Sequence, residues 1–240
     1  MRYLASISYD GSHFYGFQRL NNGLGVQNEL ERVLSIIAKE SVCVHGSGRT
    51  DRGVHAYMQC IHFDLDIDIS LDKLKYVMNR LLNSYVVVNN LQVVQNDFHA
   101  RHDVYEKTYL YKVYVGEKNP FLSDYAYITR DKFDLEKMQE AAKCFLGLHN
   151  FKNFVSGERE SYETVINSFS VIKSGDYYYF RVTGKSFYRY MVRSLVGALL
   201  DVGLGKKDID LIKKALENPY ELETFFVAPS EGLYLENIKY

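Results

Sequence analysis

VCVHGSGRTDRGVHAYMQCIHF, residues 42–63, is the stretch that decides how the rest of the chain is interpreted. Its apolar residues at Val42 to Val44 and at Ala56 to Phe63 predict two strands. The segment between them, HGSGRTDRGV, is punctuated by glycines and polar residues, which is typical of an ordered loop. The sequence therefore predicts a loop between two strands that presents one acid flanked by two arginines.

Strands and helices alternate outward from this loop. Towards the N-terminus, residues 2–9 alternate as a strand, Gly11 to Gly25 is a loop, and Val26 to Lys39 has apolar residues at helical spacing. Towards the C-terminus, we expect a helix at Leu71 to Leu82, strands at Tyr85 to Val94 and Val104 to Val115, a helix near 133–146, strands near 164–173 and 177–184, helices at 187–202 and from Asp208, and a strand at 232–239.

The order of elements in the second half echoes the order in the first. We predict an α+β fold of two similar α/β-sandwich-like halves, with mixed or antiparallel sheets flanked by helices. Residues 1–103 carry the acidic loop, and residues 104–240 carry a tyrosine-rich strand and a basic helix. The glycine-rich turn and long parallel series of a dinucleotide fold are missing. A cleft between the halves is the expected active site.

The composition is that of a globular protein with a hydrophobic fraction of 47% and a charged fraction of 25%. The formal net charge of −1 is not what a nucleic-acid partner usually requires, so any RNA surface must be local. The best candidate is the stretch from Lys185 to Lys207, whose cations are Lys185, Arg189, Arg193, Lys206 and Lys207.

The cysteines and the apolar segments bound the compartment. Cys43, Cys60 and Cys144 are odd in number and never spaced as CxxC, which argues against a disulfide framework and a structural zinc site. The N-terminal residues alternate and reach a turn before a signal-like block forms, and no later stretch is long and uncharged enough to span a bilayer. We expect a cytoplasmic protein without a membrane partner.

The residues alone leave the role of the acidic loop open. An Asp beside Arg in a loop is usually a surface ion pair or an Asx turn, and a catalytic carboxylate is the alternative for Asp51. Arg193 stands among apolar helix residues, which indicates partial burial and a need for a partner. Tyr109 is one of 21 tyrosines, and most strand tyrosines are packing residues.

A set of blocks occurs in a fixed order from one end of the chain to the other. They are Tyr9-Asp10-Gly11, Tyr15-Gly16-Phe17-Gln18-Arg19, Val26-Gln27, Gly48-Arg49-Thr50-Asp51, Gly53-Val54-His55-Ala56, Asp97-Phe98-His99-Ala100-Arg101, Lys107-Thr108-Tyr109-Leu110-Tyr111, Phe187, Met191-Val192-Arg193, Val196-Gly197, and Glu231-Gly232-Leu233-Tyr234-Leu235. Together they resemble the TruA family of tRNA pseudouridine synthases. One block has little specificity, whereas the ordered set is highly specific.

The resemblance implies an isomerase that converts uridine to pseudouridine in the tRNA anticodon stem-loop, at positions 38 to 40. The reaction breaks the glycosidic N–C bond, turns the uracil and rejoins it through carbon, so no cofactor is needed. It requires a carboxylate nucleophile and a group that manages a proton at the new C–C bond. Asp51 matches the family's nucleophile.

The resemblance also assigns the residues around Asp51. Arg193 is expected to pair with the carboxylate and keep it ionised. Arg49 is expected to help hold the flipped nucleotide, and the ring of Tyr109 to stack on the extruded uracil while its hydroxyl assists proton transfer. Tyr111, at the same strand parity, fits either a packing or a binding role.

Two loops outside the acidic one are expected to contact RNA. They carry Arg19 and Arg101, together with His13 and His99, and mix cationic and aromatic groups as single-stranded or distorted RNA requires. Polar loops with ordinary aromatic packing are the alternative. The family acts as a homodimer with one RNA reaching across both subunits, so the resemblance implies a second copy of the chain as a partner.

The chain departs from the family at several positions. Arg52 replaces the alanine that usually follows the catalytic aspartate, and it either contacts a phosphate or marks a pocket for a different RNA. The stretch Asn79 to Ser84 lacks the family's proline, Asn150 stands where an aspartate often follows histidine, and Phe17 stands where tryptophan is usual. These departures leave the catalytic set intact and put the identity of the substrate in doubt.

Three alternative functions stay open. A paralogue acting on ribosomal RNA would show the same motifs, and a non-catalytic RNA-binding module would share the aromatic and basic loops. A metal-dependent hydrolase is the third, although its potential ligands have poor spacing and form no recognised metal motif. Those ligands are His45, Asp51, His55, His62, His99 and His102. We expect no metal and no cofactor.

Overall fold

The structure is a computed structural model that describes residues 1–21, 23–221 and 223–240. It contains two compact units. Unit 1 comprises Met1–Tyr105 together with Tyr234–Tyr240, and unit 2 comprises Glu106–Leu233. The sequence placed all of residues 104–240 in the second half, whereas the last strand belongs to unit 1 because it pairs with a strand of that unit.

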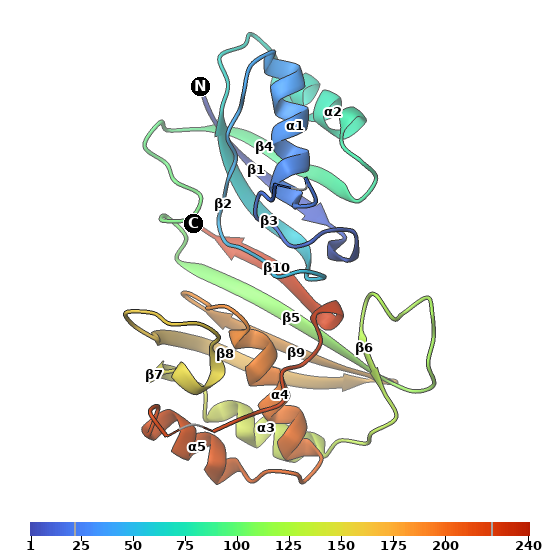
Figure 1. Cartoon of the computed structure of the whole chain (residues 1–240), viewed down its shortest axis with the longest axis vertical. Coiled ribbons are helices and arrows are strands. Elements are labelled where there is room, and N and C mark those ends of the chain that lie inside the picture. The colour runs from blue at the N-terminus through green and yellow to red at the C-terminus, as the bar shows by residue number, and fades with distance from the viewer. Residues whose placement is uncertain (22, 222) are drawn as a thin grey trace. The chain divides into compact units, whose positions relative to one another are not determined.

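Unit 1 is built on a mixed sheet. Its strands lie in the order β4-β1-β3-β10, and the short β2 pairs with β3 (Figure 1). β1 is antiparallel to both β3 and β4, whereas β10 runs parallel to β3, with Tyr234 opposite His55. The bounds are β1 Arg2–Tyr9, β2 His45–Gly46, β3 His55–Asp64, β4 Val86–Val94 and β10 Leu233–Lys239.

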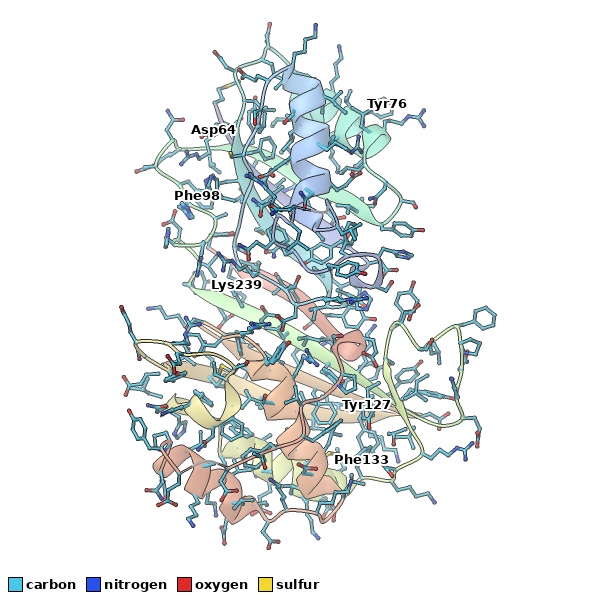
Figure 2. All side chains as sticks on the ribbon, in the orientation of Figure 1. Asp64, Tyr76, Phe98, Tyr127, Phe133 and Lys239 are labelled. Atoms are coloured by element: carbon cyan, nitrogen blue, oxygen red, sulfur yellow. The ribbon has the colours of Figure 1, made fainter. Side chains whose placement is uncertain are left out.

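Two amphipathic helices, α1 (Val26–Ala38) and α2 (Leu71–Leu81), cover one face of this sheet (Figure 1). The apolar spacing that predicted α1 is its buried face, and the helix ends where Lys39 adopts a left-handed conformation. Ser70 caps α2 by accepting a hydrogen bond from the Lys73 amide. Tyr76, on α2, points away from the sheet into solvent (Figure 2).

The strand predicted at Val42 to Val44 is wrong, because pairing with β3 begins only at His45. Both valine side chains are buried, which explains the apolar signal. Their backbone amides are satisfied by α1 instead of a neighbouring strand. Val42 donates to Ser35 Oγ at 3.0 Å, and Val44 donates to Glu31 Oε1 at 3.0 Å.

The strands of unit 2 lie in the order β5-β9-β8-β7, with the short β6 parallel to β5 (Figure 1). β5, β9, β8 and β7 are joined by antiparallel pairings. The bounds are β5 Glu106–Val115, β6 Tyr127–Thr129, β7 Gly147–Asn150, β8 Glu163–Ser174 and β9 Tyr177–Gly184. The sequence did not predict β6 and β7, which are too short to show a period.

Three helices complete unit 2, namely α3 (Leu135–Lys143), α4 (Met191–Gly203) and α5 (Ile209–Glu217). The 3-10 turns of the molecule are η1 Gly11–His13 in unit 1, and η2 Lys152–Phe154 and η3 Ser230–Gly232 in unit 2. Phe133 meets the ring of Tyr178 edge-on, with ring centroids 5.6 Å apart (Figure 2). This contact packs the segment before α3 against β9.

Helix α4 is not the basic helix that the sequence predicted. Arg193 is its one cation, and every other residue of the helix is buried. The neighbouring cations lie in the segments before and after it, and the Lys207 ammonium is 4.3 Å from the ring of Phe225. The helix is therefore a core element that carries one half-buried guanidinium.

The α+β fold predicted from the sequence is confirmed, with mixed and antiparallel strand pairing and helices flanking the strands of each unit. Among the described residues, none of the helices has the length and hydropathy that crossing a bilayer would require.

Candidate active site

Asp51 lies in a short, ordered loop that leads into β3. The Val54 amide donates to the Asp51 carbonyl at 3.2 Å, which closes a tight turn. Gly53, inside that turn, has φ of +79°, a conformation that favours glycine. The Asp51 side chain is half-buried, whereas Arg49 and Arg52 are exposed. The loop thus holds a carboxylate between two solvent-facing guanidinium groups.

The loop is anchored to β3 by Gln59, a fully buried residue of that strand. Its Oε1 accepts a hydrogen bond from Ser47 Oγ, and its Nε2 donates to the Gly48 carbonyl at 3.0 Å. Sequence reasoning missed this residue. A glutamine inside an otherwise apolar strand next to the acidic loop was the available signal, because a buried amide needs partners.

The segment that follows β1 anchors the loop from the other side. Tyr9 Oη lies 2.8 Å from Thr50 Oγ1, and the Phe17 amide donates to the Thr50 carbonyl at 3.1 Å. A Cβ on Gly11 would come within 2.0 Å of the Val54 carbonyl oxygen, so only glycine allows this approach. The blocks around Tyr9 and Phe17 therefore hold the acidic loop in place.

His55 is a second residue whose structural role the sequence did not show. The side chain is 2% exposed, its Nδ1 accepts the Gly11 amide at 3.1 Å, and its ring stacks on Tyr234 with centroids 4.6 Å apart. Tyr234 belongs to β10, so the stack joins the end of the chain to the start of β3. His55 fixes the loop's exit in this geometry.

The three other arginines assigned to unit 1 differ in their surroundings. The Arg19 guanidinium makes a two-pronged pair with Glu31, at 2.6 and 2.5 Å. Burial alone would raise the pKa of Glu31, but its hydrogen bonds, first of all with Arg19, lower it below the usual value. Arg52 stacks on the ring of Tyr15 at 4.0 Å, and Arg101 is exposed. Arg19 thus makes a structural ion pair.

The loop that carries Arg101 is tied to the sheet by Arg2. The Arg2 guanidinium donates to both carboxylate oxygens of Asp64, at 2.9 and 2.8 Å, and to the Phe98 carbonyl at 2.9 Å (Figure 2). Beside this tie, one ring nitrogen each from His45, His62 and His99 lies within 4.8 Å of the others. Over the described ranges of the chain, this is the one such group of potential metal ligands, and it includes neither His55 nor Asp51.

Hydrogen bonding in this histidine group argues against a metal ion. Nδ1 of His62 accepts the Ala100 amide at 3.1 Å, and Nδ1 of His99 accepts the Arg101 amide at 3.1 Å. A neutral imidazole that accepts at Nδ1 carries its proton on Nε2, which leaves no lone pair there for a cation. Burial lowers the pKa of His62 to about 4, so its ring is neutral. The metal-dependent hydrolase finds no support in this arrangement.

In unit 2, Tyr109 lies on β5 opposite Val182 of β9, and its side chain is 8% exposed. The ring of Phe187 meets it edge-on with centroids 5.0 Å apart. An edge-to-face contact of this kind restricts the orientation of the tyrosine ring. The side chain is therefore held in a fixed position on β5.

Tyr111, two residues further along β5, is a packing residue. It is fully buried, and its hydroxyl donates to the Pro229 carbonyl at 2.7 Å. Burial raises the pKa of Tyr111 well above its ordinary value. A Cβ on Gly232 would lie 2.6 Å from Tyr111 Cζ, so glycine at this position makes room for the ring. The structure resolves the open role of Tyr111 in favour of packing.

Arg193 lies in the first turn of α4 and is half-buried. Its Nε donates to the Ala228 carbonyl at 2.6 Å, and its guanidinium lies 4.8 Å from the centre of the Tyr190 ring. Tyr190 has φ of +62°, an unusual left-handed conformation for a tyrosine, at the start of the helix. These contacts fix the side chain at the helix N-terminus.

Comparisons with known proteins show the family of the chain. Residues 5–103 and 141–240 match the family described as tRNA pseudouridine synthase. The tRNA pseudouridine synthase A of Staphylococcus aureus (strain MRSA252) is 42% identical over 99% of this chain and 91% of the relative. The enzyme of the same name from Staphylococcus carnosus (strain TM300) is 43% identical over 99% of this chain and 90% of the relative.

A crystal structure of a Cbf5-Nop10-Gar1 complex has a TM-score of 0.34 and 14% identity, over 71% of this chain and 39% of that one. A likeness of that size carries no argument. The sequence comparisons define the class as RNA uridine-to-pseudouridine isomerases. Within that class, the chain belongs to the tRNA pseudouridine synthase family.

Proposed function

We propose that the chain converts uridine to pseudouridine in the tRNA anticodon stem-loop, at positions 38 to 40, with Asp51 as the nucleophile. The observation that carries this proposal is the Asp51 loop, which is anchored on both sides and flanked by two exposed guanidinium groups. A carboxylate that a fixed loop holds in one position can serve as a nucleophile.

The reaction is an isomerisation in which atoms and electrons balance within one nucleotide. The carboxylate of Asp51 adds to the uridine, the N–C glycosidic bond breaks, the uracil turns, and a C–C bond forms to the same sugar as the bond to Asp51 breaks and the free carboxylate is regenerated. A proton leaves the carbon of the new bond and is returned to the ring nitrogen that was released. No redox cofactor and no metal enters this scheme.

Residues of unit 2 complete the proposed site. We assign Arg193 as the cation that pairs with Asp51, and Tyr109 as the ring that stacks on the flipped uracil. The clamped geometry of Arg193 and the fixed plane of Tyr109 support these assignments.

The remaining substrate contacts are assigned by exposure. Arg49 and Arg101 present free-standing side chains to solvent, and we propose that Arg49 holds the flipped nucleotide while Arg101 contacts the RNA backbone. The structure favours an ion pair over an RNA contact for Arg19, because its guanidinium bonds both carboxylate oxygens of Glu31. We further propose a homodimer that acts on tRNA in the cytoplasm.

Substitution of the nucleophile tests the proposal. Asp51→Asn keeps the size of the side chain and removes the carboxylate, so purified variant and unmodified tRNA should form no pseudouridine, while the wild-type protein forms it in the presence of a chelator. Asp66→Asn, at an exposed acid of the same unit, is the matched control and should retain wild-type turnover. Thermal unfolding should be the same for all three proteins within a few degrees.

Two results would contradict the proposal. Pseudouridine formed by Asp51→Asn at the wild-type rate would remove the aspartate from the chemistry. Wild-type protein that binds tRNA without forming pseudouridine would favour the RNA-binding module. Mapping pseudouridine in total RNA with and without the protein separates tRNA from ribosomal RNA as the substrate.

A further inference from the structure

Arg52 stands directly after Asp51, and its side chain is exposed. Its guanidinium carbon lies 4.0 Å from the centre of the Tyr15 ring, which is itself 48% exposed. Within residues 1–21, 23–221 and 223–240, no acidic side chain or carbonyl accepts a hydrogen bond from this guanidinium. Its N–H donors are therefore available on an exposed side chain that is adjacent in sequence to the proposed nucleophile.

The stack is held by the backbone rather than by the two side chains alone. The Tyr15 amide donates to the Leu24 carbonyl at 2.9 Å. Gly16, with φ of +106°, lets this segment approach the acidic loop so closely that a Cβ would lie 2.8 Å from the Thr50 carbonyl oxygen. The next residue, Phe17, donates to that same oxygen. Tyr15 and Arg52 are thus fixed side by side.

A stacked guanidinium is suited to one kind of ligand. The aromatic ring covers one face of the planar group and restricts its rotation, while the N–H groups on its edge remain available. That edge matches two oxygens of a phosphate, and an arginine held in place loses less side-chain entropy on binding than a free one. An ordinary surface arginine would be paired or mobile.

We propose that the Arg52–Tyr15 pair is a phosphate site, which binds a backbone phosphate of the RNA next to the uridine that Asp51 attacks. This inference rests on the proposed function and adds the part of the substrate that the pair recognises. The pair contributes to affinity and register, and the chemical step is left to Asp51. It also supplies local positive charge to a chain whose formal net charge is −1.

Substituted RNA gives the most direct test. A set of anticodon stem-loops, each with one neutral methylphosphonate in place of a phosphate, is assayed for pseudouridine formation with wild-type protein and with Arg52→Ala. A methylphosphonate at one position close to the target uridine should raise KM about five- to tenfold for the wild-type protein and leave KM of Arg52→Ala unchanged. The effects of removing the phosphate charge and of removing the guanidinium should not add, because both remove the same contact.

Protein variants separate charge from stacking. Arg52→Ala should raise KM about five- to tenfold at unchanged kcat and make the slope of log KM against log salt shallower by about one phosphate contact. Arg52→Lys and Tyr15→Leu should each give part of this effect, because each keeps the charge and loses the stack. Tyr15→Phe should behave as wild type. Lys73→Ala, an exposed cation at the start of α2, is the control for a nonspecific change of charge.

Three results would overturn the inference. The first is an Arg52→Ala protein with wild-type KM and salt dependence. The second is an Arg52→Ala protein that still senses every methylphosphonate that the wild-type protein senses. The third is a response to abasic nucleotides in place of methylphosphonates, which would mean that the guanidinium stacks on a base.

Failure of the proposed function gives a different result. Wild-type protein without pseudouridine formation would contradict the isomerase assignment alone. The affinity of wild-type protein and Arg52→Ala for the same substituted stem-loops, measured as Kd, would then decide whether the Arg52–Tyr15 pair binds phosphate.

Discussion

Tyr109 and Tyr111 lie two residues apart on β5 and differ in the contacts that hold their side chains. Both side chains are largely buried, yet the ring of Tyr109 is fixed by an edge contact from Phe187, whereas the hydroxyl of Tyr111 is bonded to the backbone of Pro229. The hydroxyl of Tyr111 is engaged by the fold, which assigns this residue to the core. The role of Tyr109 in the site stays a prediction from the family resemblance.

Tyr111→Phe tests this separation. The variant leaves a buried carbonyl without its donor, so the free energy of unfolding should fall by about 1–2 kcal/mol in urea titrations. Its pseudouridine formation should stay within about twofold of wild type below the melting transition. Tyr109→Phe is the variant for comparison and should reduce kcat. Equal loss of activity in both variants would contradict the assignment.

His62 gives the fold a defined pH dependence. Burial, aided by His45 and His99, lowers its pKa to about 4, below the 6.5 of an unfolded chain. Between these values the unfolded chain binds more protons, so stability is complete above pH 6.5 and is lost as the pH falls towards 4. From pH 7 to pH 5, His62 should account for about 2 kcal/mol of lost unfolding free energy.

His62→Asn is the informative variant, because the amide oxygen can still accept the Ala100 N–H. Its unfolding free energy should vary less between pH 7 and pH 5 than that of the wild-type protein, by about the same 2 kcal/mol. Most carboxylates titrate below this window, so they contribute little to it. Identical pH profiles for the two proteins would show that His62 is not shielded from protonation.

At the scale of elements, helix α4 is placed by a close backbone contact. A Cβ on Gly197 would lie 1.6 Å from the Phe226 carbonyl oxygen, which is rigid backbone. The segment that follows also exchanges hydrogen bonds with Arg193, whose Nε donates to the Ala228 carbonyl and whose own carbonyl accepts the Ala228 amide. The glycine therefore sets the position of the helix that carries Arg193.

Gly197→Ala should lower the free energy of unfolding by at least about 2 kcal/mol, since α4 must move away from residues 226–228. Gly203→Ala in the same helix is the control, because its Cβ would meet the flexible side chain of Met138 at 2.8 Å. That variant should lose less than about 1 kcal/mol. Urea titrations of both proteins compare the two costs, and equal values would mean that the Phe226 contact is not limiting.

Elements with a clear period were predictable, and elements held by distant partners were not. The ranges of α1, α2 and β9 follow from apolar spacing and capping residues, within two residues at each end. The predicted strand at Val42 failed because α1 side chains bind the backbone amides there. A segment whose backbone amides bond side chains can bury the same apolar residues as a strand, so the sequence pattern does not distinguish the two.

At the scale of the molecule, the near-neutral charge limits how one chain can bind RNA. A formal net charge of −1 leaves the local cations as the source of phosphate binding, and a homodimer would bring two sets of them to one RNA. This is the physical reason to expect the dimer that the family resemblance implies.

Light scattering at working concentration tests the dimer. The wild-type protein should show twice the mass of one chain, and addition of one tRNA per dimer should shift the whole population to a single complex. A mass of one chain at micromolar concentration, with full activity, would contradict the dimer and leave the assignment of the active-site residues standing.

The sequence by itself determined the α+β class, the acidic loop with Asp51, and the ordered blocks that the family comparisons bear out. These features depend on local spacing and on residue identity, which the chain carries directly. Tertiary structure alone decided that β10 pairs with β3, that Glu31 takes the guanidinium of Arg19, and that Gln59 holds the acidic loop. Each of those contacts joins residues far apart in sequence or buries a polar group, and no local pattern encodes such a partner.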